Sequence, residues 1–166
     1  MNALWSYFWP AFAAGLLCGG IAGSIAFRPR SKRNAALAAG LFASLVLAAL
    51  WHGPLGAADR FSTRVERNAR RTLDYYEMTQ VTAHLHRGPL TRRLVLAGPA
   101  DDFQSSELVR LTSQLPGVSR AQWTAASAGP PLILEGIGVS VLGFLFGLLL
   151  AYLVELRRRY NAQWTW

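Results

Sequence analysis

Residues 136–154 read GIGVSVLGFLFGLLLAYLV, a run without a single charge. A helix needs about 20 predominantly apolar residues to cross the hydrocarbon core of a bilayer, which is about 30 Å thick. Glu135 and Glu155 bracket the run, and three consecutive arginines follow at 157–159. The pattern predicts a membrane-spanning helix, which we assign to residues 132–156.

Two further apolar runs precede it. Residues 1–27 carry no charge, and 4–27 are long enough to span, with Pro10 tolerated in the first turns. A cleaved signal peptide has a basic start and a shorter apolar core, so we expect this helix to be retained. Residues 34–52 are rich in Ala and Leu. A buried soluble helix is the alternative, but the two flanking apolar runs favour a third span.

The positive charge has a topological explanation. The chain has a formal net charge of +8, with 52% hydrophobic and only 16% charged residues, whereas soluble domains carry about 25% charged residues. Basic residues beside helix ends mark the cytoplasmic side, and the densest clusters are 28–33 and 157–166. We therefore expect these two segments to be cytoplasmic. The N-terminus and residues 59–124 then lie outside, which is the periplasm if the protein belongs to the inner membrane of a Gram-negative bacterium. No nucleic-acid partner is expected.

Residues 59–124 have the character of a small water-facing domain. From 59 to 76, apolar residues recur every three or four positions, as in an amphipathic helix. A second face of the same segment carries Arg60, Arg64, Arg67 and Arg71, which are candidates for contact with lipid or a partner. The alternative is a solvated face whose arginines pair with the interleaved acids, for example Glu66 with Arg70 at i,i+4 spacing.

The rest of the domain predicts two strands, a helix and a strand. Residues 79–86 alternate in polarity, which predicts a first strand, and residues 92–98 are predicted to form a second strand. The turn at 87–91 that joins them is longer than a tight hairpin turn. Asp101 and Asp102 can cap a helix. The predicted helix runs from this cap to about residue 115, and a last strand follows at 118–124. The apolar side of the helix consists of Phe103, Leu108, Leu111 and Leu115. The expected fold is a membrane protein with three transmembrane α-helices and a small α+β domain of order α-β-β-α-β.

This domain resembles the BON domain, a small module of bacterial envelope proteins, over about residues 65–124. The resemblance rests on Leu94-Val95-Leu96-Ala97-Gly98, then a helix, then Leu115-Pro116-Gly117-Val118 before the last strand. It implies a non-catalytic domain that binds phospholipid or another envelope component.

Small residues at four-residue spacing let helix backbones approach closely in a membrane. Each predicted span has such a stripe, and the candidate packing positions are Gly15, Gly19 and Gly23, Ala39 and Ala43, and Gly143 and Gly147. The stripes could pack the three helices on one another or dock a different subunit.

Sequence motifs for catalysis, cofactor binding and metal binding are not found. His84 and His86 lie on one side of a predicted strand, but a zinc site normally needs three or four ligands. We therefore expect no enzyme, no cofactor and no metal. The first hypothesis is a protein that presents its periplasmic domain to phospholipid or an envelope partner. The second is an accessory subunit of a membrane complex or a homo-oligomer, with Trp164 and Trp166 of the aromatic tail contacting lipid or the partner.

Overall fold

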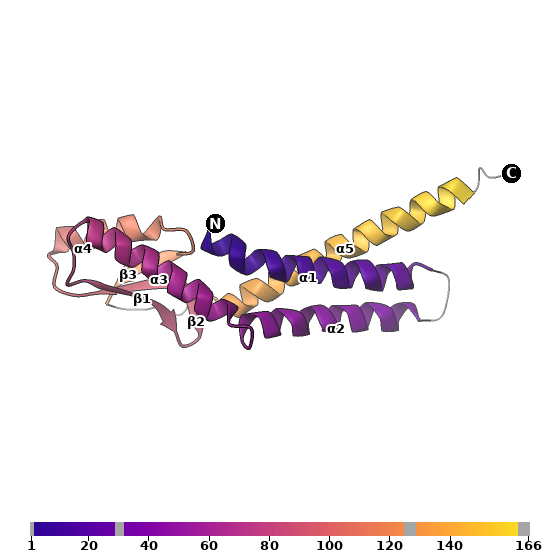
Figure 1. Cartoon of the computed structure of the whole chain (residues 1–166), viewed down its shortest axis with the longest axis horizontal. Helices are drawn as coiled ribbons and strands as arrows, with labels where there is room; N and C mark the ends of the chain where they lie inside the picture. The colour runs from indigo at the N-terminus through magenta and orange to yellow at the C-terminus, as the bar shows by residue number, and fades with distance from the viewer. Residues whose placement is uncertain (1, 29–31, 125–128, 163–166) are drawn as a thin grey trace. The chain divides into compact units, whose positions relative to one another are not determined.

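A computed structural model of the chain describes residues 2–28, 32–124 and 129–162. Over these residues it forms five helices and three strands (Figure 1). The chain divides into two compact units. We call Met1–Tyr7 with Gly56–Glu135 the α/β unit, and Phe8–Leu55 with Gly136–Trp166 the helical unit.

Three helices supply the helical unit, namely α1 (Ala3–Ala26), α2 (Arg33–His52) and α5 (Leu132–Ala162). Among the described residues, these three are the helices long and apolar enough to cross a membrane. Their bounds lie close to the predicted spans. The main difference is that α5 continues through the basic segment that we assigned to the tail. Arg159 there makes an i,i+4 ion pair with Glu155 at 3.1 Å, which favours continuation of the helix.

A buried hydrogen bond joins α2 to α5. The hydroxyls of Ser44 and Ser140 lie 2.8 Å apart, and the Ser140 hydroxyl also lies 3.3 Å from the carbonyl oxygen of Ser44. Both side chains are fully buried. Hydrogen bonds between apolar helices contribute about 0.6 kcal/mol on average.

Ser44→Ala should therefore lower the free energy of unfolding in mild detergent only slightly, by about 0.6 kcal/mol. The reason is that Ser140 keeps the Ser44 carbonyl as an acceptor. Thermal unfolding followed by tryptophan fluorescence measures the change. Ser24→Ala is the control, because Ser24 bonds only within its own helix, to the carbonyl of Ile21. Equal effects of the two substitutions would contradict an interhelical role.

The α/β unit contains α3 (Ala57–Tyr75), β1 (Thr82–Arg87), β2 (Leu90–Ala97), α4 (Asp102–Ser113) and β3 (Arg120–Trp123). Its element order is the predicted α-β-β-α-β. The strands form one sheet in the order β1-β2-β3, with β1 antiparallel and β3 parallel to β2. Parallel neighbours need a crossover connection, and α4 provides it.

The core of this unit lies between the two helices and one face of the sheet. Alternate strand residues are buried, as expected for a sheet covered on one side. Most of the apolar face predicted for the first helix of the domain is buried as well, except that Tyr76 at its end is exposed. The main core residues are Phe61, Val65, Ala69 and Leu73 of α3, and Ala83, Leu85, Leu94, Leu96 and Ala121 of the strands.

Gly98 and Gly117 both have backbone conformations that favour glycine. Gly98 has φ +151° and Gly117 has φ +108°, in the region that residues with a Cβ rarely adopt. A Cβ on Gly117 would also lie 2.6 Å from the side chain of Val65. Both positions therefore require glycine for conformation and for space.

Three local predictions were wrong. The strands run to Arg87 and resume at Leu90, so the turn between them has two residues, and a register shift after Leu85 accommodates it. Phe103 is 75% exposed, because the buried side of α4 passes through Leu108 and Thr112.

The third wrong prediction was the pair of Glu66 with Arg70. The Glu66 carboxylate instead accepts hydrogen bonds from the backbone N–H of Leu85 at 3.0 Å and from Arg87 at 2.9 Å. The i,i+4 pair on this helix is Arg70 with Asp74, at 2.8 Å. Glu66 therefore bonds to strand β1, although helix spacing alone would pair it with Arg70.

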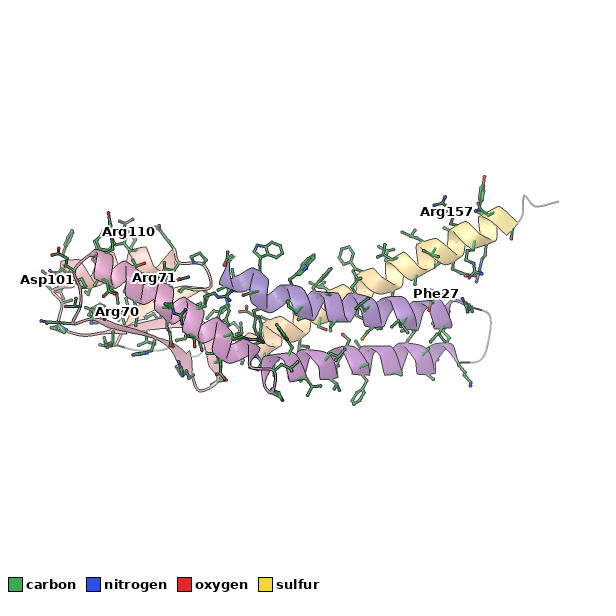
Figure 2. The ribbon with its side chains drawn as sticks, viewed as in Figure 1. Phe27, Arg70, Arg71, Asp101, Arg110 and Arg157 are labelled. Carbon is green, nitrogen blue, oxygen red and sulfur yellow. The ribbon has the colours of Figure 1, made fainter. Side chains whose placement is uncertain are left out.

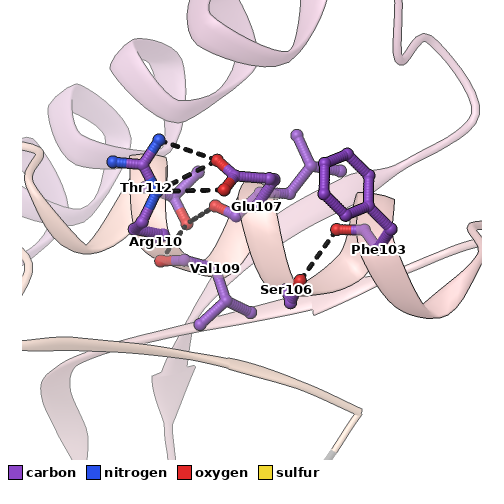
Figure 3. Close-up of polar contacts among 7 residues, drawn as sticks. Phe103, Ser106, Glu107, Val109, Arg110 and Thr112 are labelled. Atoms are coloured by element: carbon purple, nitrogen blue, oxygen red, sulfur yellow. Dashed lines mark hydrogen bonds and ion pairs between the residues drawn. The ribbon is translucent and has the colours of Figure 1, made fainter.

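The helix α4 begins at the predicted cap. The Asp101 carboxylate accepts a hydrogen bond from the backbone N–H of Gln104 at 2.6 Å, and the Gln104 side chain completes a capping box. One turn later Arg110 donates to Glu107 at 2.7 Å (Figure 3). This hydrogen bond lowers the pKa of the Glu107 carboxyl below its ordinary value.

Because the folded-state pKa of Glu107 is lowered, its contribution to stability is complete above the pKa of the unfolded chain. It is lost as the pH falls through the lower, folded-state pKa. Arg110→Gln should return the pKa of Glu107 toward the ordinary value of a glutamate. A carbon-13 NMR titration of the carboxyl group measures the change, and an unaltered pKa would show that Arg110 does not cause the shift.

Candidate functional site

The arginine row consists of Arg60, Arg64, Arg67 and Arg71 on α3, and all four side chains are exposed. Their steps of four, three and four residues place them on one helix face. That face is opposite the buried one, which carries Val65 and Ala69. Figure 2 labels Arg71 and its neighbour Arg70 on this helix.

Two of the three acids of α3 pair with residues outside the row. Glu66 pairs with Arg87 at 2.9 Å and Asp74 pairs with Arg70 at 2.8 Å. Within the part of the chain that the structure describes, Arg67 and Arg71 have no ion pair or side-chain hydrogen bond. The alternative of a face paired with its interleaved acids therefore does not hold for these two arginines.

A shallow hollow of about 290 Å³ lies along the first half of the row. Arg60, Arg64 and Arg67 line it together with Thr63 and Asp59. The guanidinium group is a planar fork of donors that matches a phosphate oxygen pair. The chemistry that this surface can perform is binding of a phosphate or another oxyanion.

The row starts beside the first turns of α1. Arg64 donates a hydrogen bond to the Ser6 hydroxyl at 2.7 Å. The Tyr7 and Phe61 rings pack with their centroids 5.6 Å apart. These residues belong to the α/β unit, so the start of α1 is part of that unit. Ser6 was missed by the sequence analysis, because no sequence pattern links it to an arginine 58 positions away.

A second contact ties the sheet to the start of α5. Arg92 pairs with Glu135 at 3.0 Å, with both side chains about one quarter exposed. Arg92 also donates to the carbonyl of Gly117 at 3.2 Å. Next to it, Thr91 forms an isolated β-bridge with Pro131. The α/β unit therefore includes the first residues of two long apolar helices.

The predicted packing glycines of α1 and α5 face each other inside the helical unit. A Cβ on Gly15 or Gly19 would overlap the backbone carbonyl of Ser140 or Phe144, respectively. In return, a Cβ on Gly143 or Gly147 would overlap the carbonyl of Phe12 or Leu16. Gly23 lies against the side chain of Ala151. The two helices cross in contact along these residues.

The predicted stripe on α2 does not form the contact face of that helix. Ala39 and Ala43 are exposed, while the buried residues of this helix are Ser44 and Ala48. Gly40, one turn before Ser44, would place a Cβ 2.5 Å from the Cβ of Ala22 on α1. The contact face is thus rotated by one residue from the predicted alanines. The predicted contacts Trp164 and Trp166 lie outside the described residues.

The two histidines of β1 do not belong to a metal cluster. Across residues 2–28, 32–124 and 129–162, no group of three or more His, Cys, Asp or Glu side chains could hold a metal ion. His86 lies with its Nδ1 3.3 Å from the carbonyl oxygen of Pro89. His86 therefore contacts the turn of its own hairpin.

The chain matches no protein-family model, no curated protein sequence and no solved structure.

Proposed function

We propose that the chain is a non-enzymatic protein of a bacterial inner membrane whose BON-like periplasmic domain binds anionic phospholipid headgroups through the arginine row. The observation that carries the proposal is that, within the described residues, Arg67 and Arg71 are exposed and have no acidic partner. On the same face Arg64 donates a hydrogen bond to Ser6, in a helix that can span the bilayer. The termini of a span lie at the headgroup level. We therefore expect Arg64, which donates to Ser6, to lie near the level of the lipid phosphates.

Each Lys or Arg close to an anionic membrane surface contributes about 1 kcal/mol to the attraction. This attraction is electrostatic and acts over about 8 Å at physiological ionic strength, so added salt should weaken the binding.

Arginine footprinting of the intact protein in lipid nanodiscs tests this proposal. Phenylglyoxal modification of Arg64 and Arg67 should be several times slower in discs of phosphatidylglycerol than in discs of phosphatidylcholine, and high salt should remove the difference. The exposed Arg120 of β3 is the internal control, because it lies outside the row. Equal labelling of Arg64 and Arg67 in the two lipids would refute headgroup binding.

A second function has one observation in its favour. The contacts between α1 and α5 occupy Gly15, Gly19, Gly143 and Gly147. Ala39 and Ala43 of α2, in contrast, are exposed. Small residues permit close approach of another helix, so α2 could dock a second subunit. In that case Ala39→Leu with Ala43→Leu should release the chain from a larger assembly after gentle detergent extraction. Migration of the wild-type protein as a single chain would exclude this role.

A further inference from the structure

A groove of about 410 Å³ runs between α1 and α5 inside the helical unit. Its floor consists of residues with small side chains, since Gly20 of α1 and Gly147 and Ala151 of α5 line it. Larger apolar side chains form its walls. The wall residues include Leu17, Ile21, Leu150 and Val154, all at least half exposed. The groove is therefore apolar along most of its length.

One end of the groove is basic. Arg28 and Arg158 line it, together with Glu155. The Glu155 carboxylate already pairs with Arg159 at 3.1 Å, and Arg159 also donates to the Phe27 carbonyl at 3.0 Å. Within the described ranges, Arg28 and Arg158 have no ion pair or side-chain hydrogen bond. Two uncompensated guanidinium groups therefore remain at this end. Figure 2 labels the neighbouring Phe27 and Arg157 on α1 and α5.

The length of the groove matches one leaflet of a bilayer. Its lining on α1 runs from Leu16 to Arg28, which is about 18 Å at about 1.5 Å per residue. Half of the hydrocarbon core is about 15 Å. A chain that entered from the basic end would thus reach about the middle of the bilayer.

We infer that this groove binds one molecule of an anionic glycerophospholipid. One acyl chain lies along Gly20, Gly147 and Ala151, and the phosphate is held by Arg28 and Arg158. Charge complementarity selects the anionic headgroup, because neither arginine has an acidic partner among the residues that the structure describes. Basic pockets between membrane helices on the cytoplasmic side are suited to such headgroups. The site is separate from the arginine row of α3, which the proposed function uses.

Native mass spectrometry of the full-length protein in mild detergent tests the inference. The probes are dioleoylphosphatidylglycerol and dioleoylphosphatidylcholine at equal concentration. We expect one phosphatidylglycerol to be retained per chain and phosphatidylcholine to be retained weakly. Arg28→Gln with Arg158→Gln should reduce retention at least about tenfold. Arg157→Gln is the matched control, because it removes a neighbouring charge that does not line the groove.

A second variant tests the apolar part. A Cβ on Gly20 meets no atom within 4 Å, so Gly20→Leu should fold and place its side chain where the acyl chain would lie. Retention of phosphatidylglycerol should then fall while the unfolding temperature stays close to wild type. Full retention in Gly20→Leu, or equal losses in Arg157→Gln and the double variant, would overturn the inference. These variants leave α3 unchanged, so footprinting of the arginine row reports on the proposed function independently.

Discussion

Gly19→Ala should lower the free energy of unfolding in mild detergent by about 1–3 kcal/mol, the range for overpacking of a close contact. The added Cβ would lie 2.8 Å from the carbonyl carbon and 3.0 Å from the Cα of Phe144. Both are backbone atoms, so the clash can be relieved only if α1 and α5 move apart. Separation would weaken the neighbouring contacts of Gly15 and Gly143 as well.

The adjacent glycine provides a matched control for this prediction. Gly20→Ala introduces the same methyl group into the same turn of α1, but nothing lies within 4 Å of it. It should leave stability unchanged or raise it slightly, because alanine has the higher helix propensity. The midpoint of thermal unfolding, followed by tryptophan fluorescence, compares the two variants. Equal midpoints would mean that α1 and α5 do not pack as described.

Leu96→Ala should destabilise the α/β unit by about 2–5 kcal/mol, the range for truncation of a buried leucine. Leu96 lies on the central strand β2, and its side chain is fully buried between the sheet and the helices. A domain of this size buries a small core and has little stability in reserve. The substitution should therefore leave a large fraction of these domains unfolded.

Limited proteolysis of the intact protein measures this effect. Cleavage within residues 56–124 should become much faster in Leu96→Ala, while the long apolar helices stay protected by detergent. Phe103→Ala is the control, because Phe103 is 75% exposed and its removal leaves the core intact. Comparable cleavage of the two variants would show that the core does not lie on this face of the sheet.

Patterns within short segments sufficed for much of the fold. The long uncharged runs predicted helices whose ends agree with those of α1, α2 and α5 to within a few residues, except that α5 continues to Ala162. Apolar periodicity located the buried face of α3, and Asp101 located the start of α4. These features depend on neighbours a few positions apart, so hydrophobicity, capping and helical period are sufficient to predict them.

Contacts between distant segments were the part that the sequence could not supply. Glu66 was assigned to Arg70 by helix spacing, yet it bonds to β1. The alanines of α2 formed a regular stripe, yet Ser44 and Ala48 are the buried positions of that helix. In both cases the helix alone allowed more than one arrangement, because several side chains or faces were available for contact. The neighbouring strand or helix determined which of them makes the contact.

The sequence by itself determined which segments avoid water, which segments form helices or strands, and how much positive charge α3 carries. Tertiary structure alone decided where that charge remains uncompensated, because ion pairs depend on which elements meet. It also decided that Arg64 lies beside Ser6 and that small residues of α1 and α5 form the floor of a groove. Pairing and cavities arise from the relative position of helix and strand surfaces, and local sequence does not specify that position.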